Sequence, residues 1–452
     1  MKVIIVGAGE VGFHLAQWLE SERKEIVMID KNPEVLKWVI EHLDVMTIRG
    51  SGSDPRVLEE AGLKHADVLL AATDSDEVNL TCCYFTNLIA PDIQKVMLAR
   101  NEEYARYHEK LAGDLKINTI INPDAEVIHS LQRIIHAPEV EEINDFVGGQ
   151  IKMVGKHLSA SSPLNGVKIS QLPEKYKNHP VIIAAIVRDE QLIVPKGNDS
   201  LRAEDLVYFV FEERHFGEII KSFGWQSKTL KNILIFGGGN IGFGLAQSLE
   251  GNRFNVKLIE KDPERCQTLS RQLQRTIVLQ GNATDQVFLE QENIGRMDLV
   301  VAMTRDEEMN ILSCLLAKRL GAQKTVARVN NIGYMPLVEA IGIDHIVSPR
   351  MAAMNSIFPY LHRGRVISTV SIKGINAEVL EAVALESSDI TGKALKYLRF
   401  PKEALILCIF RDREVIIPDG NSVIYPDDRL IILSTRESIS RVEQVLAHRG
   451  TW

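Results

Sequence analysis

Two glycine-rich segments of this chain have the residue types and spacing of a loop that binds a phosphate group. In the first segment, Gly7, Gly9 and Gly12 form a GxGxxG pattern. An apolar run over residues 3–6 predicts a buried strand before the loop, and a helical pattern begins near Phe13. In this context the first glycine permits a tight turn, the second lets a pyrophosphate approach the backbone, and the third lets the helix pack closely on the strand. The N–H groups at the helix N-terminus then bind the anion. The residues predicted to form this site are Gly7, Ala8, Gly9, Glu10, Val11 and Gly12.

An acidic residue follows at the position that a bound adenosine ribose requires. Asp30 closes a second apolar run, residues 26–29, about 20 residues beyond the loop. A carboxylate there can accept hydrogen bonds from both ribose hydroxyls and repels a 2′-phosphate, which favours NAD over NADP. ATP, ADP and AMP offer the same ribose and phosphate groups and remain alternatives. Asp30 could also simply end a strand, but the glycine loop upstream favours ribose binding.

The whole arrangement occurs twice in the chain. Residues 2–13 are matched by residues 232–243, and Asp30 is matched by Glu260. The second copy therefore predicts a second nucleotide site. Glu260 is one methylene longer than aspartate and Gly238 changes the stiffness of the loop, so the two sites need not share an affinity or a ligand. The residues predicted to form the second site are Gly237, Gly239, Asn240, Ile241, Gly242 and Glu260.

Polar residues follow further predicted strands at the edge where doubly wound sheets bind ligands. Thr73 and Asp74 come directly after the apolar run 68–70, and Thr73 is a candidate to hydrogen-bond a ligand. Thr304 repeats Thr73, whereas Arg305 replaces Asp74 and reverses the charge. This replacement predicts functional divergence between the two halves. Two arginines after further apolar runs are candidate phosphate ligands, with plain solvent exposure as the equally weighted alternative: Arg100 and Arg328.

The segments that follow the two glycine-loop units also repeat. With each glycine-loop unit called A and each following segment called B, the chain has the order A-B-A-B. The predicted fold is α/β, with two Rossmann-like, doubly wound parallel-sheet domains, each followed by a small α+β domain. Apolar runs at 181–187, 206–211, 405–410 and 430–433 predict the strands of the small domains. The predicted domain boundaries are 1–122, 140–224, 230–348 and 367–450.

Amphipathic helices are predicted in the two bridges that follow the A units. The first begins after Asn122-Pro123 and the second after Ser348-Pro349, where a cap and a proline of the first turn are well placed. Such apolar stripes could bind a partner, but packing of each helix on its own domain is the favoured interpretation. The apolar positions are Val127, Ile128, Leu131, Ile134 and Ile135 in the first bridge and Met354, Ile357, Phe358 and Leu361 in the second.

Composition excludes several classes of protein. With 452 residues, 45% of them hydrophobic, the chain is long enough for about three or four domains, and the repeat sets the number at four. A net charge of −8 lacks the clustered positive charge of a nucleic-acid binder. No apolar run approaches the ~18 residues of a transmembrane helix, and no leader precedes the first strand, so a cytoplasmic protein is predicted. Five cysteines without CxxC spacing predict reduced, buried thiols.

An enzyme has to be considered, because dinucleotide loops most often belong to dehydrogenases. Dehydrogenases add a different substrate domain that carries a general acid or base, whereas this chain adds a second copy of itself. His157 and His179 lack counterparts in the second copy and are interpreted as lone surface or core residues, and no HExxH, Walker lysine or GxSxG motif occurs. The sequence therefore favours a sensor whose ligand shifts a packing equilibrium, with no catalytic or metal site. An NAD-dependent oxidoreductase is the alternative.

The chain resembles the tandem RCK, or KTN, proteins that regulate potassium transport. The resemblance rests on the duplicated loop and acidic residue, the segments 50–54 and 281–285, the pair Ala72-Thr73 and the A-B-A-B order, and it covers essentially the whole chain. It implies an RCK-N domain followed by an RCK-C domain, twice per subunit, that bind NAD, NADH or adenine nucleotides. Many single-RCK relatives have Gly-Asp where this chain has Gly50-Ser51 and Gly281-Asn282. Ser51 and Asn282 can still hydrogen-bond a ribose or a phosphate.

The same resemblance implies a place in the cell and a set of partners. The chain would be a peripheral regulatory subunit on the cytoplasmic side of the inner membrane, gating an integral-membrane Trk-type potassium transporter. It would assemble into a homo-oligomeric ring, expected to be a tetramer of tandem subunits, and would bind no nucleic acid. A structural reading stays open in which the second A unit has lost its ligand and serves only to form the ring, although Glu260 argues mildly against it.

Overall fold

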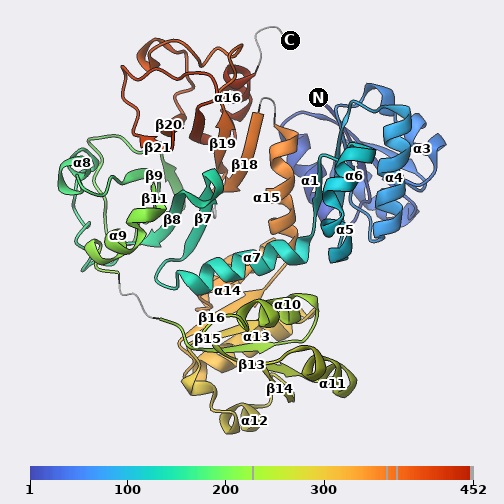
Figure 1. The fold of residues 1–452 in the computed structure, drawn as a ribbon, viewed down its shortest axis with the longest axis vertical. Helices are drawn as coiled ribbons and strands as arrows, with labels where there is room; N and C mark the ends of the chain where they lie inside the picture. Colours follow the sequence, from blue (N-terminus) through green and yellow to red (C-terminus); the bar gives the residue numbers. More distant parts are fainter. Residues whose placement is uncertain (226–228, 363–364, 373–374, 448–452) are drawn as a thin grey trace. The chain divides into compact units, whose positions relative to one another are not determined.

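The computed structural model describes residues 1–225, 229–362, 365–372 and 375–447 (Figure 1). These residues form two compact units. The first unit consists of residues 1–129 together with residues 347–361. The second unit contains residues 130–346 and the chain from residue 362 onward.

The first unit is built on a six-stranded parallel sheet with the strand order β3-β2-β1-β4-β5-β6. Its central strands are apolar on both faces because helices cover both sides, as parallel sheets require. The strand order reverses between β1 and β4, which is the point where doubly wound sheets bind ligands. The strands are β1 (Lys2–Val6), β2 (Glu25–Asp30), β3 (Met46–Arg49), β4 (Val68–Ala71), β5 (Gln94–Leu98) and β6 (Thr119–Ile121).

Side-chain caps fix the starts of the helices that cover this sheet. Asn32 accepts a hydrogen bond from the Glu34 backbone N–H at 3.0 Å, with Pro33 in the first turn, so α2 begins where both residue types are favoured. Ser75 caps α4 in the same way. The helical elements are α1 (Glu10–Ser21), α2 (Pro33–His42), α3 (Pro55–Glu60), η1 (Leu63–His65), α4 (Asp76–Ile89), α5 (Glu102–Arg106) and α6 (His108–Leu115).

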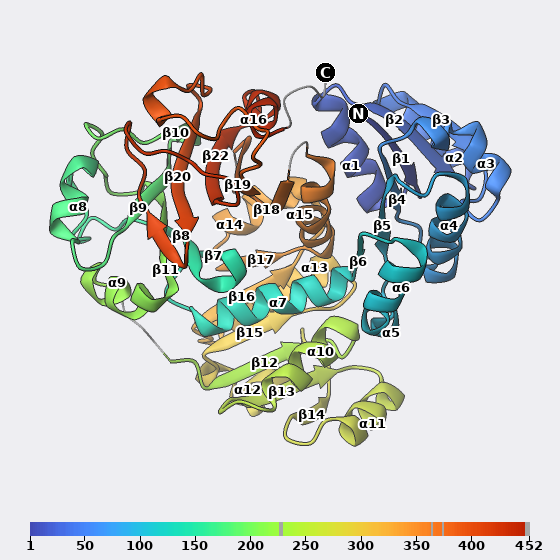
Figure 2. The ribbon, with the colours of Figure 1, turned by 45° about the horizontal axis from the view of Figure 1, so that its top comes forward.

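Helix α15 (Pro349–Leu361) follows the second sheet in the sequence but packs on the first, against α1 (Figures 1 and 2). Ile357 and Phe358 are buried in the apolar cluster of α1 and β1, and the Trp18 and Phe358 ring centroids lie 4.6 Å apart. The prediction that this helix packs on its own domain is therefore wrong. An apolar stripe shows which face of a helix is buried, but the hydrophobic effect is non-directional and does not select the sheet that buries it.

Helix α7 (Pro123–His136), in the first bridge, is divided between the two units. Residues 130–136 belong to the unit that holds the second sheet. There the His136 ring lies edge-on to Phe254, with 6.2 Å between the ring centroids. Besides the predicted packing on its own domain, this helix thus also contacts the segment that leads into β13 (Asn255–Glu260).

The second parallel sheet repeats the first, with the order β14-β13-β12-β15-β16-β17, which confirms the duplication. Its strands are β12 (Asn232–Phe236), β13 (Asn255–Glu260), β14 (Ile277–Gln280), β15 (Leu299–Ala302), β16 (Lys324–Arg328) and β17 (His345–Val347). Its helical elements are α10 (Asn240–Leu249), α11 (Pro263–Gln272), α12 (Gln286–Gln291), η5 (Ile294–Arg296), α13 (Glu307–Arg319), η6 (Ile332–Tyr334) and α14 (Met335–Ala340).

Two five-stranded antiparallel sheets form the small domains, in the orders β10-β9-β11-β8-β7 and β18-β19-β22-β20-β21. The first contains β7 (Glu142–Phe146), η2 (Val147–Gly149), β8 (Ile151–His157), η3 (Ile169–Gln171), α8 (Leu172–Lys175), β9 (Ile182–Arg188), β10 (Gln191–Ile193), β11 (Leu206–Glu212), η4 (Glu213–His215) and α9 (Phe216–Ser222). The second contains β18 (Arg365–Ser371), β19 (Ala377–Val383), η7 (Leu395–Tyr397), β20 (Ala404–Arg411), β21 (Glu414–Ile416), β22 (Arg429–Thr435) and α16 (Ile439–Leu446).

Residues that repeat between the small domains stabilise this fold. Arg188 donates two hydrogen bonds of 2.7 Å to the buried Asp205 carboxylate, and Arg411 pairs with Asp428 in the same way. Such bidentate, charge-assisted pairs fix both partners in orientation. The recurrence of this pair in both small domains thus has a structural explanation.

A buried histidine lies between two carboxylates of the second small domain. The His362 Nδ1 atom lies 2.8 Å from Glu443 Oε1, and its Nε2 atom lies 3.5 Å from Glu378 Oε2. Burial alone would lower the pKa of His362, but the hydrogen bonds and charges of the two carboxylates raise it to about 9. The imidazolium therefore stays charged at neutral pH.

The predicted α/β fold class is confirmed, and the predicted strands of the small domains lie where the apolar runs placed them. All five cysteines are buried and unpaired, as predicted. In the described part of the chain, no helix has both the length and the apolar character to cross a membrane. The domain boundaries stay predictions, and the last of them, residue 450, lies outside the described residues.

Candidate nucleotide-binding sites

The first glycine loop has one position for each role that a phosphate loop requires. Gly7 has φ +106°, and a Cβ atom on it would lie 2.6 Å from the Ala72 carbonyl oxygen. A Cβ atom on Gly12 would lie 1.9 Å from the Gly7 oxygen, so glycine lets α1 sit directly against the loop. Around a Cβ built on Gly9, no described heavy atom lies within 4 Å. Gly9 therefore faces open space at the N-cap of α1, where the first helical N–H groups face outward.

The second loop has the same geometry with one difference. A Cβ atom on Gly242 would again lie 1.9 Å from a carbonyl oxygen, that of Gly237, and Gly239 again faces open space. A Cβ atom on Gly238 would lie 2.3 Å from Leu269 Cδ1. The first copy has Ala8 and the smaller Val39 at these two positions. Gly238 thus makes room for a larger side chain underneath the loop.

The Asp30 carboxylate, at the end of β2, fixes the first loop and keeps hydrogen-bonding capacity. Its Oδ2 atom accepts the Ala8 N–H at 2.8 Å, and its Oδ1 atom accepts the Asn32 N–H at 2.8 Å. A carboxylate offers about four acceptor positions, two on each oxygen. One position on each oxygen therefore remains, which matches the pair of hydroxyl groups on an unmodified ribose.

The Glu260 carboxylate has fewer free hydrogen-bond acceptor positions than that of Asp30. Its Oε2 atom accepts the Gly238 N–H at 2.8 Å, while Oε1 accepts the N–H groups of both Lys261 and Asp262, at 2.7 and 3.0 Å. Three of about four acceptor positions are thus used within the protein. Arg265, where the first copy has Val35, donates from Nε to the Gly238 carbonyl oxygen at 2.8 Å. The second site consequently has a weaker ribose acceptor and an additional positive charge.

A buried asparagine that sequence reasoning missed organises the edge of each sheet. Asn79 is fully buried; its Oδ1 atom accepts the N–H and the hydroxyl of Thr73, and its Nδ2 group donates to the Leu98 carbonyl at 2.9 Å. Asn310 does the same for Thr304 and the Arg328 carbonyl. The single proton of each threonine hydroxyl is therefore donated inside the protein. A ligand could use Thr73 only as an acceptor. The signal available in the sequence was an asparagine six residues after the threonine in both copies, at Asn79 and Asn310.

The remaining predicted residues differ in how accessible they are. Glu10, Asp74 and Arg100 are exposed, and Arg328 is half-buried. Ile241 is buried, so it can offer a ligand only its backbone. Val11 is half-buried, and Asn240 lies at the exposed start of α10. The Ser51 hydroxyl pairs with Ser53 at 2.8 Å, and the Asn282 Oδ1 atom accepts the Thr284 N–H at 3.1 Å, so both shape their own loops.

A hollow borders the first loop on the side of α1 and α2. Its volume is about 400 Å³, and Phe13 and Trp38 form its aromatic wall, with 4.1 Å between the ring centroids. His14 also lines it and lies 2.8 Å from the Arg350 guanidinium of α15. Burial, and then the charge of Arg350, lower the pKa of His14, so this imidazole is neutral at pH 7. The full lining is Ala8, Gly9, Glu10, Phe13, His14, Glu34, Val35 and Trp38.

Two sheets of identical strand order, each with a phosphate-type loop at its switch point, define a tandem protein of the Rossmann-like nucleotide-binding class. Family models match each of the four segments: the TrkA-N domain over residues 3–123 and 233–349, and the TrkA-C domain over residues 157–224 and 379–447. The chain therefore belongs to the TrkA family of Trk-system potassium uptake proteins.

Curated relatives agree with this assignment, and solved structures agree with the fold. The chain is 34% identical to the Trk system potassium uptake protein TrkA of Halomonas elongata, over 96% of this chain and 95% of that protein. It is 35% identical to TrkA homolog 1 of Methanosarcina mazei, over 98% and 99%. The fold is similar to the GsuK RCK domain, with TM-score 0.63, 18% identity and coverage of 98% and 94%, and to the GsuK channel bound to NAD, with TM-score 0.63, 18% identity and coverage of 98% and 78%.

Proposed function

We propose that this chain is the regulatory subunit of a Trk-type potassium transporter, peripheral on the cytoplasmic side of the inner membrane, and that nucleotide at the first glycine loop controls transport. The observation that carries the proposal is the first loop itself. Gly9 is open at the N-terminus of α1, and Asp30 keeps one acceptor position on each oxygen. The matching relatives, named as potassium uptake proteins over their full length, supply the transport context.

NAD or NADH is the ligand that the first site fits best. The two acceptor positions of Asp30 match the 2′ and 3′ hydroxyls of an adenosine ribose, and the carboxylate disfavours a 2′-phosphate. The pyrophosphate would lie over Gly9, against the N–H groups of α1. A solved relative by fold, the GsuK channel, is described as bound to NAD, which supports this ligand class.

The second site fits a more negatively charged ligand. Glu260 has one acceptor position left, and Arg265 adds a positive charge beside the loop. ATP and ADP carry more phosphate charge next to the ribose than NAD does, so we assign the second site to these nucleotides. An absence of any nucleotide binding at this site would favour the purely structural role of the second A unit.

Helix α15 provides a physical route from the first site to the rest of the subunit. It packs on α1, whose N-terminus adjoins the glycine loop. The Arg350 guanidinium of α15 is within hydrogen-bond distance of the His14 ring of α1. The chain then runs from the end of α15, at Leu361, directly into the last small domain. A ligand that repositions α1 would shift the populated orientation of α15, and a homo-oligomeric ring would pass this change to the transporter.

Calorimetry on matched variants tests the site assignment. Asp30→Ala should abolish NADH binding at the first site, while Glu260→Ala should leave it unchanged and weaken ATP or ADP binding. Unchanged NADH binding in Asp30→Ala would overturn the assignment. Copurification from membranes, with identification of the integral protein, tests the partner. Steady oxidation of NADH by the purified protein with a small carbonyl substrate would instead support the alternative, an oxidoreductase.

A further inference from the structure

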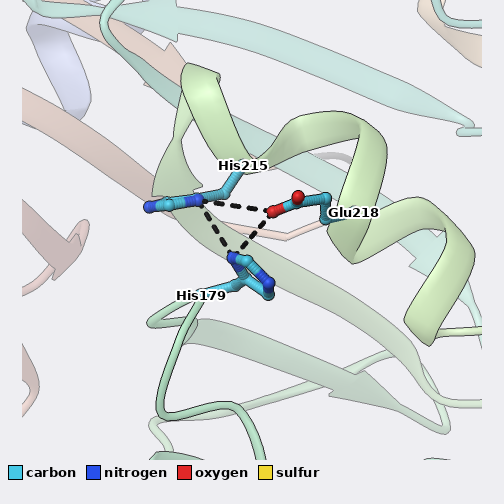
Figure 3. Close-up of side chains that lie close together, drawn as sticks. All are labelled: His179, His215 and Glu218. Carbon is cyan, nitrogen blue, oxygen red and sulfur yellow. Dashed lines mark hydrogen bonds and ion pairs between the residues drawn. The ribbon is translucent and has the colours of Figure 1, made fainter.

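Two histidines and a glutamate meet on the first small domain (Figure 3). His179 lies in the segment between α8 and β9, His215 ends η4, and Glu218 stands in the first turn of α9. The two Nδ1 atoms are 3.0 Å apart, and Glu218 Oε2 lies 2.9 Å from the Nδ1 of His179 and 3.8 Å from that of His215. Among the described residues, this is the one group of three such side chains whose donor atoms converge.

The three atoms have the spacing of ligands around a single cation. A point equidistant from them lies about 1.9 Å from each, close to the ~2.0–2.2 Å of Zn–N and Zn–O bonds. Figure 3 shows both imidazoles turned so that Nδ1 faces this point, and the carboxylate closing the third side. The Glu218 side chain is 60% exposed, so water can reach a fourth position.

Hydrogen bonds alone cannot satisfy all the contacts in this cluster. The Nδ1 of His179 is within hydrogen-bond distance of both the Nδ1 of His215 and the Glu218 carboxylate, and a neutral imidazole has a single N–H proton for these two contacts. If both rings were protonated, two positive Nδ1–H groups would face each other at 3.0 Å. One cation, by contrast, uses the lone pairs of all three side chains at once.

The site is specific to the first small domain. The register that aligns Arg188 with Arg411 and Asp205 with Asp428 places Lys402, Ser438 and Arg441 opposite the three ligands. Two of these residues are positively charged and would repel a metal ion. The second domain thus keeps the same fold without the cluster, which shows that the fold does not require it.

We propose that His179, His215 and Glu218 bind a divalent transition-metal ion, of which Zn²⁺ fits the donor set best, with water as the fourth ligand. Two imidazoles and one carboxylate suit Zn²⁺, Co²⁺ or Ni²⁺, whereas Ca²⁺ and Mg²⁺ prefer oxygen ligands throughout. The ion would tie the segment before β9 to the start of α9, whose Ile219 and Ile220 fill the core of the domain. Metal binding would therefore hold α9 in place.

Titration of the chelator-treated full chain with Zn²⁺ tests the proposal. Calorimetry should find one ion per chain at this site, with the affinity reduced by at least about 100-fold in His179→Ala and His215→Ala. Co²⁺ should give the intense visible absorption of a tetrahedral site in the wild type and lose it in both variants. His157→Ala is the matched control, because His157 is an exposed histidine of the same domain that pairs with Glu141 instead.

Circular dichroism in chelator should show the wild-type fold for each variant. Glu218→Gln, a change at an exposed position, provides a second test if a histidine variant does not fold, and it should weaken Zn²⁺ binding while His157→Ala does not. Equal Zn²⁺ affinity and stoichiometry in the wild type and in the cluster variants would overturn the proposal, because binding would then be adventitious.

Discussion

Adding a single methyl group should destabilise the protein at one position of the first loop and leave its stability nearly unchanged at another. In Gly12→Ala the new Cβ atom would lie 1.9 Å from the Gly7 oxygen, against a lower limit of about 3.0 Å for real contacts. Helix α1 must therefore move by about 1 Å or more, and overpacking of this kind costs about 1–3 kcal/mol or more. In Gly9→Ala nothing described is in the way, and φ −71° with ψ −171° suits alanine. Gly9 is the N-cap of α1, where glycine is favoured over alanine, and this offsets the about 0.4–1 kcal/mol that alanine gains by restricting the unfolded chain, so stability should stay close to that of the wild type.

Gly9→Ala should weaken NADH binding, an effect that the stability measurement does not detect. Its methyl group would occupy the space where the pyrophosphate meets the N–H groups of α1. The loss of one charge-assisted hydrogen bond costs about 1.5–3 kcal/mol, which weakens NADH binding about 10- to 100-fold. Urea unfolding followed by tryptophan fluorescence and NADH calorimetry measure the two effects separately. NADH affinity equal to that of the wild type in Gly9→Ala, or unchanged stability in Gly12→Ala, would refute the reasoning.

Three further outcomes follow from side chains around the sites. Gly238→Ala should destabilise the second unit because its methyl group meets Leu269, and adding Leu269→Val should restore stability in a double-mutant cycle; additive losses would contradict this account. Asn79→Ala should cost on the order of 3 kcal/mol in urea unfolding, because it leaves the half-buried Thr73 N–H and the buried Leu98 carbonyl unpaired, whereas wild-type stability would argue against that role. The pKa of His362 is raised in the folded state, so its stabilisation is complete below pH 6.5 and is lost as pH rises through about 9. The loss should be on the order of 3 kcal/mol and absent in His362→Gln; an unchanged pH profile in this variant would exclude the mechanism.

The sequence was sufficient for features that depend on local pattern. Apolar runs, caps and glycine spacing predicted both sheets and both loops, because each signal lies within one strand-turn-helix segment. The packing of α15 on the first sheet was not predictable, since an apolar stripe does not specify which sheet buries Phe358 and its neighbours. The convergence of His179 and His215 was also hidden, because 36 residues separate them and only the pairing of β9 with β11 brings them together.

The predicted ligand residues show a similar limit. Thr73 was identified by its place after a strand, but its hydroxyl proton is donated to Asn79, which no motif indicated. The number of hydrogen bonds that Asp30 and Glu260 can still accept from a ligand could not be compared from residue types alone. The difference depends on how many backbone N–H groups each carboxylate already accepts.

Potassium flux through the copurified transporter tests the central claim most directly. The integral protein would be reconstituted in vesicles with this chain, with or without NADH, and compared with the Gly9→Ala chain, which keeps its fold. We predict that NADH changes the flux with the wild-type chain and does not with Gly9→Ala. Flux that is the same with and without NADH in the wild type, or that responds equally in both chains, would contradict nucleotide control through the first loop.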